Sequence, residues 1–123
     1  MNEAFATQLR TAFNARDIDT LRSLLSEGAT WGEDPHGESF CHDRDGIVRR
    51  LKQLLATGVR ATIVETRTGT RGIAAQVEVQ WHKPEDAPPD RISYAQSYVV
   101  IDGLITEIHG HDDKDSALAA ISD

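Results

Sequence analysis

Apolar residues in the first half of the chain recur at helical spacing. Over residues 5–13 they follow the i, i+4, i+7, i+8 pattern of an amphipathic helix. A second pattern of this kind covers residues 18–25. Asp17 is a typical N-cap for this second helix, and Gly28 is a natural helix stop. The two helices are short and closely joined, so we expect them to pack together as a hairpin.

A third helix is predicted further along, over residues 47–55. Asp43 or Asp45 can cap it, and Gly58 can end it. Its leucines are expected to face inward. The segment between the second and third helices, residues 30–43, is polar and is predicted to be a loop.

The second half of the chain changes to a period of two, which is typical of half-buried strands. Asp102-Gly103 is the signal of a two-residue type I′ hairpin turn. The Pro-rich stretch 84–90 cannot be a central strand. A short helix over residues 117–121 is expected to end the chain. The alternation predicts four strands, over residues 59–66, 73–81, 92–101 and 104–111.

Helices followed by an antiparallel meander predict an α+β fold. Residues 1–123 are expected to form a single domain, because this length is typical of one domain. Three N-terminal helices would cover the apolar face of a curved antiparallel sheet. Such a cone encloses a hollow, and the mouth of a hollow of this kind is a typical small-molecule site.

Composition and charge narrow the classes of function. Hydrophobic residues make up 39% of the chain and charged residues 27%, which is typical of a globular protein. The net charge of −7 and the scattered Lys and Arg residues argue against nucleic acid as a partner. The pair Arg49-Arg50 is interpreted as part of a solvated helix face.

Apolar runs fall short of the ~20 residues of a membrane span. Cys41 as the single cysteine fits a reducing compartment, so a cytoplasmic location is expected.

The segment Trp31–Gly37 is the first candidate for chemistry. It places Asp34 in a Gly- and Pro-containing loop, and functional residues concentrate on such loops. At the mouth of an apolar cavity a carboxylate loses hydration, which raises its pKa toward the range useful for a general base. The alternative is that Asp34 before Pro35 only starts a turn. Glu33 is expected to face solvent.

One strand carries a second candidate set. Tyr94, Gln96 and Tyr98 are two residues apart and therefore share a face. If that face lines the cavity, two phenols and an amide can meet the carbonyl or hydroxyl group of a ligand. The alternative is that the tyrosines are ordinary amphipathic strand residues. Trp31 is expected in the core or the cavity wall.

Histidines raise the question of a metal. His109 and His111 share a face of the last strand, and His36 and His42 lie in the long loop. A zinc site needs three or four converging ligands, so the sequence predicts no metal. If Ile108 faces the cavity, these two strand histidines face away from it, toward a possible dimer surface. No cofactor is expected.

The order of these signals resembles a known family. The stretch Ala12–Leu21, the Glu33-Asp34-Pro35 triplet and Asp102–Ile105 are similar to the NTF2-like superfamily, which includes SnoaL-like polyketide cyclases and ketosteroid isomerases. The resemblance covers nearly the whole chain as a pattern. It implies a cystatin-like cone and a homodimer through the sheet.

Ketosteroid isomerase is the closest local match. In that enzyme a Glu-Asp-Pro loop carries the catalytic aspartate, and this role falls on Asp34. Its oxyanion hole uses a tyrosine and a protonated aspartate, and these positions hold Leu9 and Gln96 here. Leu9 cannot donate a hydrogen bond, whereas Gln96 can. The resemblance to limonene epoxide hydrolase is weaker, because its catalytic triad is missing.

Two functions follow from the sequence. In the first, the protein binds a small, largely apolar molecule in its cone, and Asp34 transfers a proton in isomerase- or cyclase-like chemistry. In the second, the same cone is a non-catalytic ligand-binding or dimerisation module. The replaced Leu9 and Gln96 favour binding alone, whereas the retained Glu-Asp-Pro loop favours chemistry. The residues expected to contact the ligand are Trp31, Tyr94, Gln96, Tyr98, Leu9, Phe13 and Ile108.

Overall fold

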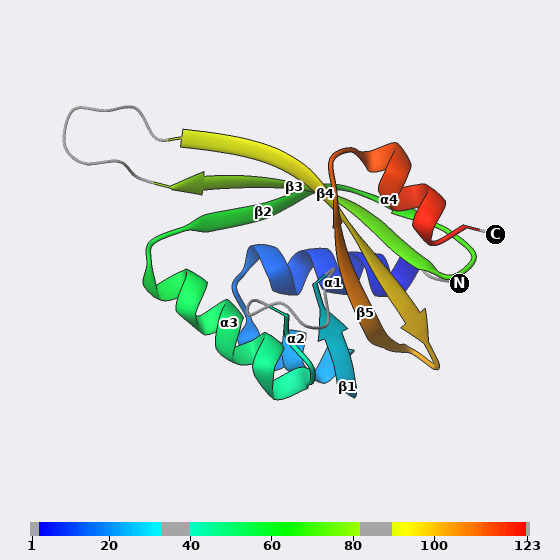
Figure 1. Cartoon of the computed structure of the whole chain (residues 1–123), viewed down its shortest axis with the longest axis horizontal. Helices are drawn as coiled ribbons and strands as arrows, with labels where there is room; N and C mark the ends of the chain where they lie inside the picture. Colours follow the sequence, from blue (N-terminus) through cyan, green and yellow to red (C-terminus); the bar gives the residue numbers. More distant parts are fainter. Residues whose placement is uncertain (1–2, 33–39, 82–89, 123) are drawn as a thin grey trace.

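A strongly curved sheet forms the centre of the molecule and carries helices on both faces (Figure 1). The computed structural model describes residues 3–32, 40–81 and 90–122. Its strands lie in the order β1-β5-β4-β3-β2. None of the helices in these ranges is long and apolar enough to cross a membrane. In chain order the elements are α1 (Glu3–Asn14), α2 (Ile18–Leu24), β1 (Leu25–Trp31), α3 (Arg44–Ala56), β2 (Arg60–Thr68), β3 (Gly72–Trp81), β4 (Asp90–Ile101), β5 (Leu104–His111) and α4 (Lys114–Ala120).

Side-chain caps start the helices where the sequence predicts. The Asp17 carboxylate accepts a hydrogen bond from the backbone N–H of Thr20 and caps α2. Asp43 accepts from the N–H of Gly46 and caps α3. Each carboxylate satisfies an N–H group that has no partner within its own helix. Of the two caps considered for the third helix, Asp43 is therefore the one that is used.

The end of the second helix is where the prediction is wrong. Helix α2 stops at Leu24, and the next residues form a strand, β1, which includes Gly28. This strand pairs in parallel with β5, with Leu25 opposite Ile105 and Trp31 opposite Ile108. The local helical spacing is overridden because β1 gains hydrogen bonds and burial against a strand some 80 positions away in the chain. The predicted antiparallel sheet therefore has one parallel edge strand, and the loop predicted from residue 30 starts later.

The hairpin between β4 and β5 fixes the register of the site. Asp102 and Gly103 have φ values of 54° and 80°, the left-handed conformation that a type I′ turn requires at both central positions. The strands on either side pair with Tyr98 opposite Ile108 and Gln96 opposite Gly110. The predicted turn is confirmed. A register shift between Val99 and Val100 follows it, and the turn and this shift together set which side chains of β5 face the concave side.

The helices divide between the two faces of the sheet. Helices α1, α2 and α3 enclose the main apolar core on the concave face, while α4 lies on the opposite face (Figure 1). The Lys114 ammonium lies 2.8 Å from a Glu65 carboxylate oxygen and links α4 to β2. This contact lowers the pKa of Glu65. Helix α4 therefore occupies part of the outer face, and a homodimer through the sheet stays a prediction. The α4 face contacts a second small apolar cluster formed by Ala74, Ala95, Val99, Ala117 and Ile121.

Side chains of α1 hydrogen-bond the backbone of β2, an edge strand. The Asn14 side-chain amide donates to the Ile63 carbonyl oxygen at 3.1 Å and accepts from the Ile63 N–H at 2.8 Å. Arg10 donates to the Val64 carbonyl oxygen at 3.0 Å. These bonds pair edge groups that would otherwise be open to another chain. They also hold α1 firmly over the concave face of the sheet.

Candidate functional site

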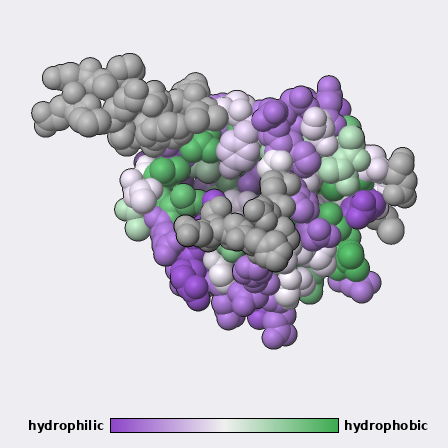
Figure 2. Space-filling view, in the orientation of Figure 1, coloured by the Kyte–Doolittle hydropathy of each residue, from purple (hydrophilic) through white to green (hydrophobic). Residues whose placement is uncertain are grey.

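A cavity lies between the concave face of the sheet and helices α1, α2 and α3. It has a narrow inner part of about 30 Å³ and a wider outer part of about 270 Å³. The two parts share lining residues, including Phe13, Trp31 and Gln96, and therefore lie next to each other. Figure 2 shows apolar side chains gathered beside a hollow on this side of the molecule. The inner part is lined by Leu9, Phe13, Leu21, Leu25, Trp31, Ile47, Leu51, Gln96, Tyr98, Ile105 and Ile108.

Strand β4 supplies most of the polar groups of this cavity. Tyr94, Gln96 and Tyr98 alternate along β4 and all line it. The residues directly opposite Gln96 are Ala75 on β3 and Gly110 on β5. Both neighbours are small, so space remains over the Gln96 amide. The cavity therefore places a polar side chain at its floor while its surroundings stay apolar.

Gln96 and Tyr98 form a hydrogen-bonded pair at this floor. The Tyr98 hydroxyl donates to Gln96 Oε1, and both side chains are buried. Burial raises the pKa of Tyr98, so the phenol stays protonated and keeps its donor role. Within the described ranges, Gln96 Nε2 has no hydrogen-bond partner. The pair therefore presents an amide donor to the cavity in a fixed orientation.

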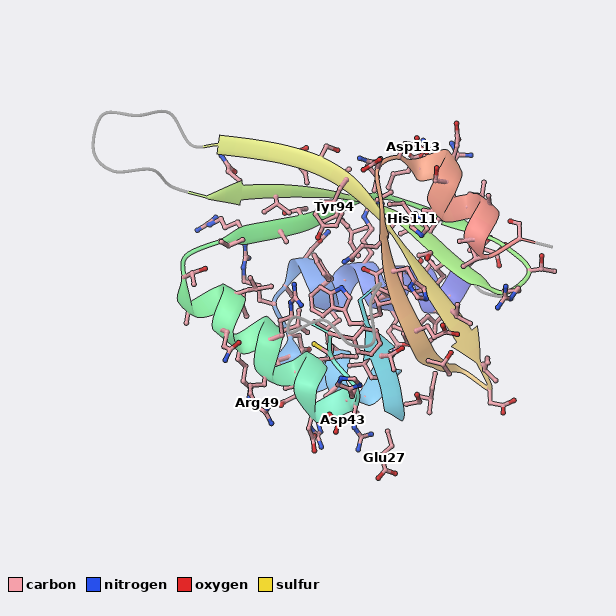
Figure 3. The ribbon with its side chains drawn as sticks, viewed as in Figure 1. Glu27, Asp43, Arg49, Tyr94, His111 and Asp113 are labelled. Carbon is pink, nitrogen blue, oxygen red and sulfur yellow. The ribbon has the colours of Figure 1, made fainter. Side chains whose placement is uncertain are left out.

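An arginine and two aromatic residues shape the outer part. The guanidinium carbon of Arg50 lies 4.6 Å from the centre of the Trp31 ring, within cation–π distance. Burial raises the pKa of Tyr94, and the positive charge of Arg50 opposes this rise. Tyr94 comes from β4, whereas Trp31 comes from β1 and Arg50 from α3 (Figure 3 labels Tyr94). The outer cavity is therefore amphipathic, with a cation set among aromatic rings.

Helix α3 contributes to the cavity wall more than to the core. Ile47 and Val48 are its buried residues, while Leu54 is 38% exposed. The leucines of α3 were expected to face inward, and Leu51, Leu54 and Leu55 line the outer cavity. Leu51 also packs against the core.

The sequence pattern led us to interpret Arg49-Arg50 as part of a solvated helix face, so Arg50 was not predicted to line the cavity. Arg49 is exposed, but Arg50 is half-buried and lines the cavity. A signal for this was present. Arg50 falls three residues after Ile47 and four before Leu54, which is the spacing of the apolar stripe. Arg16, in the connection between α1 and α2, is the other charged lining residue that was not predicted.

The residues expected to contact a ligand come together on this cavity. Leu9, Phe13, Trp31, Gln96, Tyr98 and Ile108 line its inner part, and Tyr94 lines its outer part. Asp34, Glu33 and His36 lie outside the described residues. The chain enters and leaves their segment beside the cavity, since Trp31 and Cys41 exchange backbone hydrogen bonds of 3.0 and 2.9 Å.

The two strand histidines lie on the opposite face of the sheet, as predicted. His111 Nε2 lies 2.9 Å from Ser97 Oγ, and Ser97 alternates with the cavity residues of β4. Figure 3 labels His111. His109 Nε2 lies 3.1 Å from a Glu107 carboxylate oxygen. Across the described ranges, His, Cys, Asp and Glu side chains form no group of three that could hold a metal ion.

Comparisons with known proteins agree with this architecture. The family model described as SnoaL-like domain matches residues 6–108. No curated protein matches the chain.

Solved structures share the fold at low sequence identity. A putative polyketide cyclase from Xanthomonas campestris pv. campestris is 18% identical with a TM-score of 0.70, over 97% of this chain and 95% of its own. A protein of ketosteroid isomerase-like fold from Catenulispora acidiphila, in complex with trimethylamine, is 15% identical with a TM-score of 0.70, over 98% and 93%. An NTF2-like protein of unknown function from Cytophaga hutchinsonii is 13% identical with a TM-score of 0.70, over 89% and 97%.

These structures have the cystatin-like or NTF2-like cone that the sequence predicts, with helices packed on a curved sheet. The matching family model covers most of the chain, from α1 into β5. The protein therefore belongs to the SnoaL-like domain family.

Proposed function

We propose that this protein binds a small, largely apolar molecule carrying a hydrogen-bond acceptor, such as a ketone, in the cavity over Gln96. The observation that carries the proposal is the Gln96 amide, which Tyr98 orients within an otherwise apolar inner cavity. A ligand oxygen that accepts from Gln96 Nε2 gains a hydrogen bond in mostly apolar surroundings, whereas a hydrocarbon ligand does not.

Gln96→Met tests this hydrogen bond, because methionine keeps an unbranched side chain of similar length and removes the amide. The wild-type protein is expected to bind 2-acetonaphthone, and Gln96→Met to bind it about tenfold more weakly, the value of one hydrogen bond. The matched probe 2-ethylnaphthalene lacks the carbonyl oxygen, so its affinity should not fall in the variant. Isothermal titration calorimetry measures both. Equal affinities of the two proteins for the ketone would show that Gln96 does not hold the ligand.

A second substitution tests where the probe binds. Ala61 on β2 lines the outer cavity, and its neighbour Thr62 is exposed on the other side of the strand. Ala61→Phe is expected to weaken binding of 2-acetonaphthone about tenfold, since the ring takes up the ligand's space and overpacking costs about 1–3 kcal/mol. Thr62→Phe adds the same ring outside the cavity and should leave the affinity unchanged. If Thr62→Phe blocks binding and Ala61→Phe does not, the ligand lies elsewhere.

Proton transfer by Asp34 is the second candidate function, in the manner of an isomerase or cyclase. The bridge between Trp31 and Cys41 supports it, because Trp31 lines the cavity and the bridge holds the other end of the segment beside it. Asp34 follows Trp31 by three residues, so its backbone can lie at most about 10 Å away. A carboxylate within that reach can meet the carbon next to a carbonyl group bound by Gln96. Without such a base, the same cavity serves binding alone.

A further inference from the structure

Among the residues that the structure describes, the charged groups that line the cavity are both cationic. In the described part of the lining these are Arg16 and Arg50, and no aspartate or glutamate lies among them. This is unexpected for a protein whose formal net charge is −7. A local excess of positive charge on an acidic protein marks where an anion is favoured.

Arg50 is half-buried and lies between the outer cavity and a neighbouring surface groove, and it lines both. Its guanidinium group lies over the Trp31 ring, and both residues line the outer cavity. Its positive charge also acts on the Tyr94 phenol, which lines the opposite, sheet side of the same space. The cation therefore lies close to two aromatic residues that line the outer cavity.

Arg16 brings a second cation to the same outer part. Its backbone is in the left-handed region, with φ of 56°, at the turn between α1 and α2. Hydrogen bonds from Arg16 N to the Phe13 oxygen and from Ile18 N to the Arg16 oxygen, both 3.1 Å, hold this turn in place. Among the residues that the structure describes, no carboxylate forms an ion pair with Arg16.

From this arrangement we infer that the ligand is an amphipathic organic anion, such as an aromatic or alicyclic oxo acid. This inference rests on the proposed function. An acceptor oxygen reaches Gln96 at the inner end, the apolar body lies in the wider outer part, and a carboxylate meets Arg50 and Arg16 there. A guanidinium group matches the planar, two-oxygen geometry of a carboxylate. In an aromatic-lined cavity that pairing is screened by water less than on an open surface.

A pair of probes with the same shape and different charge tests the inference. 2-Naphthylacetate carries a carboxylate, and 2-naphthylacetamide replaces it with a neutral amide. Isothermal titration calorimetry on the full chain is expected to show the carboxylate binding about tenfold more tightly, as charge-assisted hydrogen bonds predict. Arg50→Gln and Arg16→Gln should each lower the affinity for the carboxylate more than the affinity for the amide and so reduce this preference. Arg50→Lys keeps the positive charge and should keep part of the preference.

Arg60→Gln is the matched control. Arg60 is exposed on β2 and lines a neighbouring groove together with Arg16, but it does not line the cavity. This variant should bind both probes as the wild type does. Equal affinity of the wild-type protein for the two probes, or an unchanged preference in the double variant Arg16→Gln/Arg50→Gln, would overturn the anion inference alone. Failure of both probes to bind at all would overturn the proposed cavity binding with it.

Discussion

Replacing Gly72 by alanine is expected to lower the free energy of unfolding by roughly 3 kcal/mol, the upper range for overpacking a well-packed site. Gly72 is the first residue of β3 and is buried opposite Val99 on β4. A Cβ atom there would lie 1.9 Å from the Tyr98 carbonyl oxygen and 3.1 Å from the Val99 Cα. These are backbone atoms of a central strand, so the two strands must separate to admit a methyl group. The displaced carbonyl belongs to Tyr98, which orients Gln96, so the site should loosen as well.

Gly28→Ala is the control for this prediction. Gly28 also lies in a strand, but a Cβ atom added to it meets no atom within 4 Å. Its substitution should leave stability unchanged or raise it slightly, since alanine restricts the unfolded chain more than glycine does. Urea unfolding of both variants, followed by circular dichroism, measures the difference. Similar midpoints for Gly72→Ala and the wild type would mean that β3 and β4 are not packed as closely as described.

Local sequence patterns predict those parts of the fold whose hydrogen bonds join residues close together in the sequence. Caps at Asp17 and Asp43 and the turn at Asp102-Gly103 depend on bonds that span only a few positions. Strand β1 depends on pairing with β5, far along the chain, and its burial does not alternate regularly. Leu25 continues the apolar spacing of the preceding helix, so the local pattern favours a helix there. Pairing with β5 makes this segment a strand instead, and the local spacing of apolar residues carries no information about that pairing.

In the candidate site, too, local sequence patterns predict some features, while others depend on contacts between distant parts of the chain. The cavity face of β4 could be predicted because side chains alternate along a strand. Its register against β5 could not, because the turn alone would place Gln96 opposite His109, whereas a register shift between Val99 and Val100 places it opposite Gly110. Arg50 could have been found from its place in the apolar stripe of α3. Arg16 could not, because its position at the cavity depends on how the α1–α2 turn lies against the outer wall. Turns that close a cavity contribute residues that no periodic pattern marks.

Asp34→Asn is expected to slow enzyme-catalysed hydrogen exchange in a bound ketone by about 100-fold, within the range for general-base catalysis. In D₂O the wild-type protein should accelerate replacement of the methyl protons of 2-acetonaphthone by deuterium. The proposed step breaks a methyl C–H bond, the Asp34 carboxylate takes the proton, and the electron pair moves to the carbonyl oxygen. Gln96 Nε2 donates to that oxygen as negative charge develops on it. Return of a deuteron from exchanged Asp34 to carbon completes the cycle without a further reactant.

Proton NMR follows the loss of the methyl signal, and each protein is compared with buffer alone. Glu33→Gln is the matched control, because it removes the neighbouring carboxylate, which is expected to face solvent. Exchange should stay at the wild-type rate in Glu33→Gln and fall in Asp34→Asn, while both variants still bind the ketone by calorimetry. A wild-type protein that binds 2-acetonaphthone but leaves its exchange at the buffer rate would remove proton abstraction and leave a binding protein. Such an outcome would agree with the change at the Leu9 position, where the resemblance to ketosteroid isomerase implies a tyrosine and this chain has no donor. Catalysis therefore depends on whether one oriented amide can stabilise an enolate that the related enzymes stabilise with two groups.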